Sequence, residues 1–125
     1  MSVYSLTKSY FEAVDSMKAT RVADFFAEDG SFRFGNAPAA LGKTAIEQAN
    51  IDFFDMISGL SHEIIGISTG KWESGIMISV ELEVHYTRKN GTVVAPIPCV
   101  SIIRMKHDKM QDFRIFGDMS PLFAE

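Results

Sequence analysis

The run from Ile78 to Tyr86 constrains the fold more than any other part of the chain. Apolar and polar residues alternate along it with a period of two. Val80, Leu82 and Val84 therefore lie on the same side of the strand as Ile78 and Tyr86. Such alternation is typical of a β-strand with one buried face and one charged face. Hairpin signals at 73–75, 89–91 and 107–109 extend this pattern into four long strands in series, from about residue 60 to residue 116.

The first half of the chain has the periodicity of helices. Leu6, Tyr10, Val14 and Met17 form one stripe at helical spacing, which predicts a first helix with Tyr10 facing inward. A short second helix carrying Val22, Phe25 and Phe26 is expected to end near 29–30, followed by a short strand at 31–34 and a loop at 35–42 that could act as a lid. A third helix after Gly42 is expected to face inward with Ile46, Ala49, Phe53, Met56 and Ile57.

A long strand meander in so short a chain cannot be covered by a second sheet, so it must curl around its own helices. The 125 residues, of which 46% are hydrophobic, suffice for one core and one domain spanning 1–125. We therefore expect an α+β fold in which a curved antiparallel sheet wraps around three N-terminal helices as a cone. A cone of this kind has an interior pocket.

Composition excludes several classes of function. The net charge of -4 and the scattered basic residues argue against nucleic-acid binding. Cys99 is the only cysteine, which indicates a reducing compartment, and Lys8 and Glu12 interrupt any signal-peptide core. No apolar run is long enough to span a membrane. We expect a cytoplasmic protein.

Metal and cofactor sites are not indicated by the sequence. The histidines at 62, 85 and 107 have no metal-ligand spacing, and the chain contains neither a glycine-rich phosphate loop nor a serine nucleophile elbow. Cys99 has no charged activator beside it in sequence, so it is expected to be a small core residue. We therefore expect neither a cofactor nor a metal.

Several segments together resemble a known superfamily. They are the helix end at 26–30, the helix start at 42–46 and the final strand ending at 116–118, and in this order they resemble the nuclear transport factor 2-like superfamily, which includes ketosteroid isomerases, SnoaL-type polyketide cyclases, limonene epoxide hydrolase and scytalone dehydratase. Residues 84–91, with 98–99 and 114–118, are most similar to the SnoaL-like branch. The resemblance implies a homodimer formed through the outer face of the sheet.

The resemblance does not extend to the ketosteroid isomerase mechanism. It implies that Tyr10 occupies the position of the isomerase's oxyanion-hole tyrosine. However, Phe34 stands where that family has its general base, and Pro98 stands where it has a protonated aspartate. Neither side chain can transfer or donate a proton, so steroid isomerisation by that mechanism is expected to be absent.

Asp118 is the acidic residue that the resemblance places at the catalytic strand end. A carboxylate held in an apolar cone is poorly solvated, which raises its pKa and makes it a competent base. Two alternatives remain: Asp118 accepts backbone hydrogen bonds beside Ser120 and meets no ligand, or it forms a buried ion pair with Arg114, which strand parity places on the same side.

His62 is a candidate acid partner of Asp118, since a histidine at this point recurs in the SnoaL-like pattern and imidazole titrates near neutrality. The alternative is a hydrogen-bonded histidine at the rim. An epoxide-hydrolase arrangement would instead pair Glu83 with Asp118, but Glu81 stands where that enzyme needs arginine, and that register would bury two like charges.

These assignments predict a pocket for a small apolar molecule, cyclic or polyketide-like. The expected lining comprises Phe34, Val84, Tyr86, Pro98, Val100, Arg114 and Phe116. Within it, Asp118, Tyr10 and His62 would carry a cofactor-free proton transfer of the isomerase, cyclase or dehydratase type. The alternative is a non-catalytic binding or dimerisation module whose pocket is filled by side chains.

Overall fold

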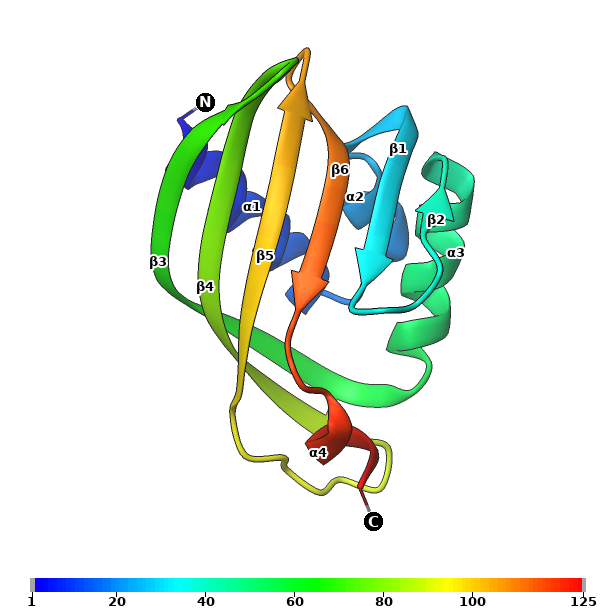
Figure 1. Cartoon of the computed structure of the whole chain (residues 1–125). Helices are drawn as coiled ribbons and strands as arrows, with labels where there is room; N and C mark the ends of the chain where they lie inside the picture. The colour runs from blue at the N-terminus through cyan, green and yellow to red at the C-terminus, as the bar shows by residue number, and fades with distance from the viewer. Residues whose placement is uncertain (1, 125) are drawn as a thin grey trace.

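The chain folds into one curved six-stranded sheet with its first three helices on the concave face, as the computed structural model shows for residues 2–124 (Figure 1). The helices are α1 (Val3–Asp15), α2 (Ala19–Ala23), α3 (Lys43–Phe54) and α4 (Ser120–Phe123). The strands are β1 (Phe26–Phe34), β2 (Ala40–Leu41), β3 (Ile57–Trp72), β4 (Gly75–Arg88), β5 (Ile97–Lys106) and β6 (Lys109–Phe116). The predicted α+β class and the four long strands in series are confirmed.

The strand order is β2-β1-β6-β5-β4-β3, so the four long strands form a meander and β1 joins it at β6. The β1–β6 pairing is parallel, whereas every other pairing is antiparallel. A register shift between Ile64 and Gly66 interrupts the β3–β4 ladder. Such bulges bend the strand that carries them, which suits a sheet that must curl around helices.

The ladder between β4 and β5 fixes which side chains face the helices. Leu82 pairs with Cys99, and Val84 pairs with Ile97, and all four side chains are buried. The buried face of β4 is therefore the one that its alternation predicts. Because directly opposed residues lie on the same face of a sheet, odd-numbered residues of β5 face the helices.

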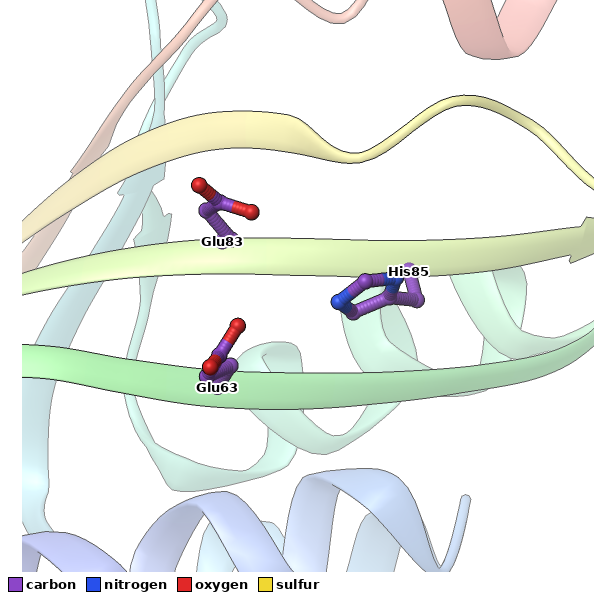
Figure 2. A group of neighbouring side chains, drawn as sticks. All are labelled: Glu63, Glu83 and His85. Atoms are coloured by element: carbon purple, nitrogen blue, oxygen red, sulfur yellow. The ribbon is translucent and has the colours of Figure 1, made fainter.

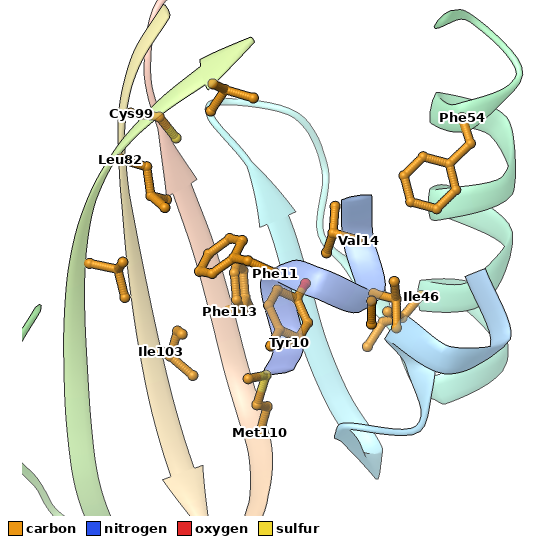
Figure 3. Close-up of a cluster of buried hydrophobic side chains, with 14 of the residues drawn as sticks. Tyr10, Phe11, Val14, Ile46, Phe54, Leu82, Cys99, Ile103, Met110 and Phe113 are labelled. Carbon is orange, nitrogen blue, oxygen red and sulfur yellow. The ribbon is translucent and has the colours of Figure 1, made fainter. Parts of the chain in front are cut away.

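Aromatic side chains fill the space between α1 and the sheet. Tyr10 is 2% exposed, and its ring centroid lies 4.9 Å from that of Phe113 on β6 and 5.1 Å from that of Phe11 (Figure 3). The inward orientation of Tyr10 is thus confirmed. At the start of α1 the hydroxyl of Ser2 accepts a hydrogen bond from the backbone nitrogen of Ser5 at 3.1 Å, which caps the helix.

Two local expectations were wrong, and one short helix was missed. Helix α2 ends at Ala23, and Phe26 begins β1 because the backbone of 25–26 pairs with Met110 of β6. Helix α3 ends at Phe54, so Met56 lies outside the core at 52% exposure. The short helix α4 was not expected.

No helix among residues 2–124 combines the length and the apolar character needed to cross a bilayer.

Candidate functional site

A cavity of about 230 Å³ lies between the concave face of the sheet and the helices. Its walls come from α1, α3 and all six strands, and most of the lining side chains are aromatic or aliphatic. Ala37 and Pro38, in the loop between β1 and β2, line the cavity and are also exposed. The cavity therefore reaches the surface beside this loop.

The strongest polar feature of the cavity wall is a hydrogen-bonded pair of His62 and Asp15. His62 lies near the start of β3, its side chain is 9% exposed, and its Nδ1 is 2.6 Å from Oδ1 of Asp15, the last residue of α1. The backbone nitrogen of His62 donates to Oδ2 of the same carboxylate at 3.0 Å. Phe11 packs against the imidazole, with ring centroids 4.9 Å apart.

This pair determines how the imidazole is presented. A carboxylate that accepts from Nδ1 holds the proton on that nitrogen, which leaves Nε2 as the basic nitrogen. Nε2 has no hydrogen-bond partner within residues 2–124, and His62 lines the cavity. The same carboxylate can stabilise the imidazolium that forms when Nε2 takes a proton.

Two tyrosine hydroxyls add to the polar lining. Tyr10 and Tyr86 both line the cavity, and neither hydroxyl has a hydrogen-bond partner among residues 2–124. In the same part of the chain, every side-chain nitrogen or oxygen that is completely buried does have a hydrogen-bond partner. Both hydroxyls must therefore reach open space. Burial raises the pKa of Tyr10 well above its usual value, and burial, with smaller contributions from Cys99 and Asp15, raises the pKa of Tyr86. Each is thus a neutral hydrogen-bond donor.

Three further polar residues lie in the wall. Asn50 of α3 donates from Nδ2 to the carbonyl of Ile46 at 2.9 Å, which fixes its amide. Ser101 and Cys99 lie on the inner face of β5. Burial raises the pKa of the Cys99 thiol to about 11, against a smaller lowering by the Ser101 hydroxyl. Cys99 is thus a neutral thiol, which agrees with the expected core residue.

Asp118 does not lie in the cavity. It follows the end of β6, is exposed, and its Oδ1 accepts a hydrogen bond from the backbone nitrogen of Ser120 at 3.0 Å. This hydrogen bond holds the pKa of Asp118 below its usual value, which is the opposite of the expected direction. The expectation that Asp118 lies in an apolar interior was wrong, and the alternative of a backbone hydrogen bond beside Ser120 is confirmed.

The expected lining was correct on two strands, β1 and β4, and one residue out of register on two others, β5 and β6. Phe34, Val84 and Tyr86 line the cavity. On β5 and β6 the lining residues are Cys99, Ser101, Phe113 and Ile115, and the expected Pro98, Val100, Arg114 and Phe116 are all exposed on the opposite face. The pairing of β5 with β6 explains this register. Ile103 and Phe113 are directly opposed and both are buried, so the odd-numbered residues from 99 to 103 on β5 and from 113 to 115 on β6 lie on the cavity side.

Arg114 does not pair with Asp118. Its Nε donates to Oδ2 of Asp112 at 2.9 Å, on the outer side of β6. The proposed ion pair with Asp118 is therefore absent from the described residues.

Asp15 is the residue beside the cavity that sequence reasoning missed, as the hydrogen-bond partner of His62. It follows Phe11 by four residues, so both side chains lie on the same edge of α1. A carboxylate at the end of an inward helical stripe was the available signal. The sequence does not show that the start of β3 crosses this edge of α1.

Solved structures with a similar fold are numerous. A protein with a ketosteroid isomerase-like fold from Catenulispora acidiphila, solved with trimethylamine, superposes with a TM-score of 0.79 at 14% identity, covering 93% of this chain and 87% of that one. A cystatin-fold protein from Novosphingobium aromaticivorans has a TM-score of 0.72 at 14% identity, over 93% and 98% of the two chains. The epoxide hydrolase/cyclase-like enzyme SalBIII, described in pyran ring formation in salinomycin, has a TM-score of 0.75 at 18% identity, over 94% and 92%.

At these identities the likeness shows the fold alone. No protein with a curated description matches the sequence. The sequence model of the SnoaL-like domain, by contrast, matches residues 7–113, which is most of the chain and includes every residue of the cavity wall except Ile115. The chain therefore belongs to the SnoaL-like family.

Proposed function

We propose that the cavity binds a small neutral molecule and that His62 moves a proton on it without a cofactor. The observation that carries this proposal is the hydrogen bond from Nδ1 of His62 to Asp15 at 2.6 Å, which leaves Nε2 free in a mostly apolar cavity. An imidazole oriented in this way is the side chain best suited to take and return a proton near neutral pH.

The lining specifies the class of ligand. No Lys, Arg, Asp or Glu side chain lines the cavity within residues 2–124. A carboxylate or phosphate would therefore enter without a cation to pair with it, at a high desolvation cost. A neutral ring compound with a carbonyl or hydroxyl group fits the aromatic walls and the few hydrogen-bond donors.

The proposed step abstracts a proton from a carbon next to a carbonyl. Nε2 of His62 accepts that proton, the carbon–hydrogen electron pair moves to form an enolate, and the charge falls on the carbonyl oxygen. The hydroxyl of Tyr10 or Tyr86 donates a hydrogen bond to that oxygen, and Asp15 stabilises the imidazolium. His62 then returns the proton to the same carbon or, in a conjugated enolate, to another carbon, which gives exchange or isomerisation. For ring closure, the enolate carbon instead attacks a second carbonyl carbon of the same ligand, and His62 gives its proton to the alkoxide that forms. Either route leaves the protein unchanged.

Hydrogen–deuterium exchange tests this step without knowledge of the net reaction. Neutral cyclic ketones and enones are first screened for binding by thermal shift, because a ligand of the folded state raises the melting temperature. Bound compounds are then incubated with the protein in deuterium oxide, and loss of the proton signal next to the carbonyl is followed by NMR. His62→Gln should slow the exchange by about 10²- to 10⁴-fold, the usual contribution of a general base.

Asp118→Asn is the matched control, because Asp118 is exposed and outside the cavity. It should exchange at the wild-type rate. Compounds that bind in the cavity but exchange equally fast with and without His62 would refute the catalytic role and leave the non-catalytic binding module as the function. A loss of exchange in Asp118→Asn with His62→Gln unaffected would restore the role expected from the sequence.

A further inference from the structure

The outer face of the sheet, opposite the cavity, carries a second group of side chains that can bind a ligand. Glu63 of β3 and Glu83 and His85 of β4 point to the same side of the sheet, where they form what we call the carboxylate–imidazole cluster (Figure 2). His62 and Val84, the residues between them in sequence, line the cavity on the other face. The cluster is therefore separate from the proposed catalytic site.

The three side chains converge. One carboxylate oxygen from each glutamate and one ring nitrogen of His85 all lie within 4.8 Å of one another. Glu63 and Glu83 are directly opposed in the antiparallel ladder, and His85 is two residues along the same strand face. The backbone positions are thus set by the regular pairing of two long strands instead of by a loop.

The cluster has no protein partner that explains it. Two carboxylates directly opposite each other across a ladder repel and destabilise the pairing. Neither glutamate forms an ion pair or a side-chain hydrogen bond anywhere in residues 2–124, and His85 forms none either. Three groups with available lone pairs, two of them negatively charged, therefore face one point that lacks a positive charge.

We propose that this point binds one divalent first-row transition ion, with Zn²⁺ as the reference case. Imidazole nitrogen and carboxylate oxygen are both established Zn²⁺ ligands. Bonds of 2.0–2.2 Å at tetrahedral angles bring ligand atoms to about 3.4 Å from each other, so small side-chain rotations close the observed separation. Waters complete the coordination. Mg²⁺ and Ca²⁺ prefer sites built from oxygen alone, so the imidazole selects against them.

The sequence did not predict this site, because metal-ligand spacing was sought along the chain. Glu63 and Glu83 are brought together only by the register of two strands. The spacing of the histidines, which suggested that no metal binds, says nothing about such cross-strand sets.

Calorimetric titration of the full chain with Zn²⁺ tests the proposal, and the visible absorption of Co²⁺ reports the ligand set independently. We expect one ion per chain. Glu63→Gln, Glu83→Gln and His85→Gln should each raise the dissociation constant by about tenfold or more, as loss of a ligand does. Glu81→Gln is the matched control: it removes the same charge from the same strand face outside the cluster, and it should change the constant by less than about twofold.

Circular dichroism establishes that each variant is folded, and since all substitutions are on the outer face, folding is expected to be retained. A wild-type constant weaker than millimolar would overturn the proposal. So would equal binding by wild type and His85→Gln, which would place the ion elsewhere, or displacement of Zn²⁺ by an equal concentration of Mg²⁺.

Discussion

The pairing of Asp15 with His62 makes a quantitative prediction about stability. Asp15→Ala removes the acceptor of two hydrogen bonds, one from the ring nitrogen at 2.6 Å and one from the backbone nitrogen of His62 at 3.0 Å. The Asp15 side chain is only 27% exposed, so water replaces the lost acceptor incompletely. We expect this substitution to be among the more costly polar changes in the chain.

The magnitude follows from the two bonds. A hydrogen bond to a charged group contributes about 1.5–3 kcal/mol, and a half-buried backbone donor left unpaired costs about 1–3 kcal/mol. Taking the lower part of each range gives a loss of about 3 kcal/mol in the free energy of unfolding. With an unfolding entropy of about 2.1 cal/mol/K per residue, a chain of 125 residues should then melt about 11 °C lower.

A double-mutant cycle with His62→Gln isolates the contribution of the ring. His62→Gln retains the backbone bond to Asp15, so Asp15→Ala in that background should cost about 1.5 kcal/mol less than in wild type. Urea unfolding followed by circular dichroism gives all four free energies. Glu12→Ala, an exposed carboxylate one turn earlier on α1, is the control and should change stability by no more than about 0.5 kcal/mol. A coupling below about 0.5 kcal/mol would refute the pairing.

Three further predictions concern other groups. Because the pKa of Tyr10 is raised in the folded state, its contribution to stability is complete below about pH 10 and is lost progressively as the pH rises above that value. In wild type, the unfolding free energy should therefore fall with pH more steeply than in Tyr10→Phe, by about 1.4 kcal/mol per pH unit between pH 10 and 11.5. Equal slopes in the two proteins would contradict the burial of the hydroxyl. The pKa of Cys99 rises from 9.0 to about 11, so at pH 8 iodoacetamide should modify the folded chain about a hundredfold more slowly than the urea-unfolded chain; equal rates would show an accessible thiolate. Without metal, Glu83→Gln should raise the melting temperature by about 1–4 °C by removing the repulsion from Glu63, while Glu81→Gln should not; a lowered melting temperature would argue against that repulsion.

The sequence predicted the fold where residue types alternate clearly. In β4 the glutamates at 81 and 83 separate two faces of opposite character, so the buried side could be read directly. In β5 both faces are largely apolar, since Cys99 and Ile103 occupy one and Val100 and Ile102 the other. A strand of this kind contains no signal for its register, which the β4–β5 ladder alone supplies.

The site was harder to predict because its members come from distant segments. Asp118 drew attention as a carboxylate at a strand end, but a local hydrogen bond to Ser120 accounts for it. Asp15 lies 47 residues before its partner, and its role depends on where the start of β3 crosses the end of α1. Periodicity shows which edge of a helix is buried, but the element that packs against that edge is a tertiary property.

The position of Asp15 in its helix supports the proposed role of its pair with His62. It is the last residue of α1, where the partial negative charge of the helix terminus disfavours a carboxylate by about 0.3–1 kcal/mol. A lysine or a neutral residue there would suit the helix better, and a leucine in place of His62 would suit the surrounding apolar wall. The arrangement makes sense only as a pair, because the hydrogen bonds between the two offset the unfavourable placement of each. What the pair adds beyond stability is a fixed imidazole with one free nitrogen, which is the property that proton transfer requires.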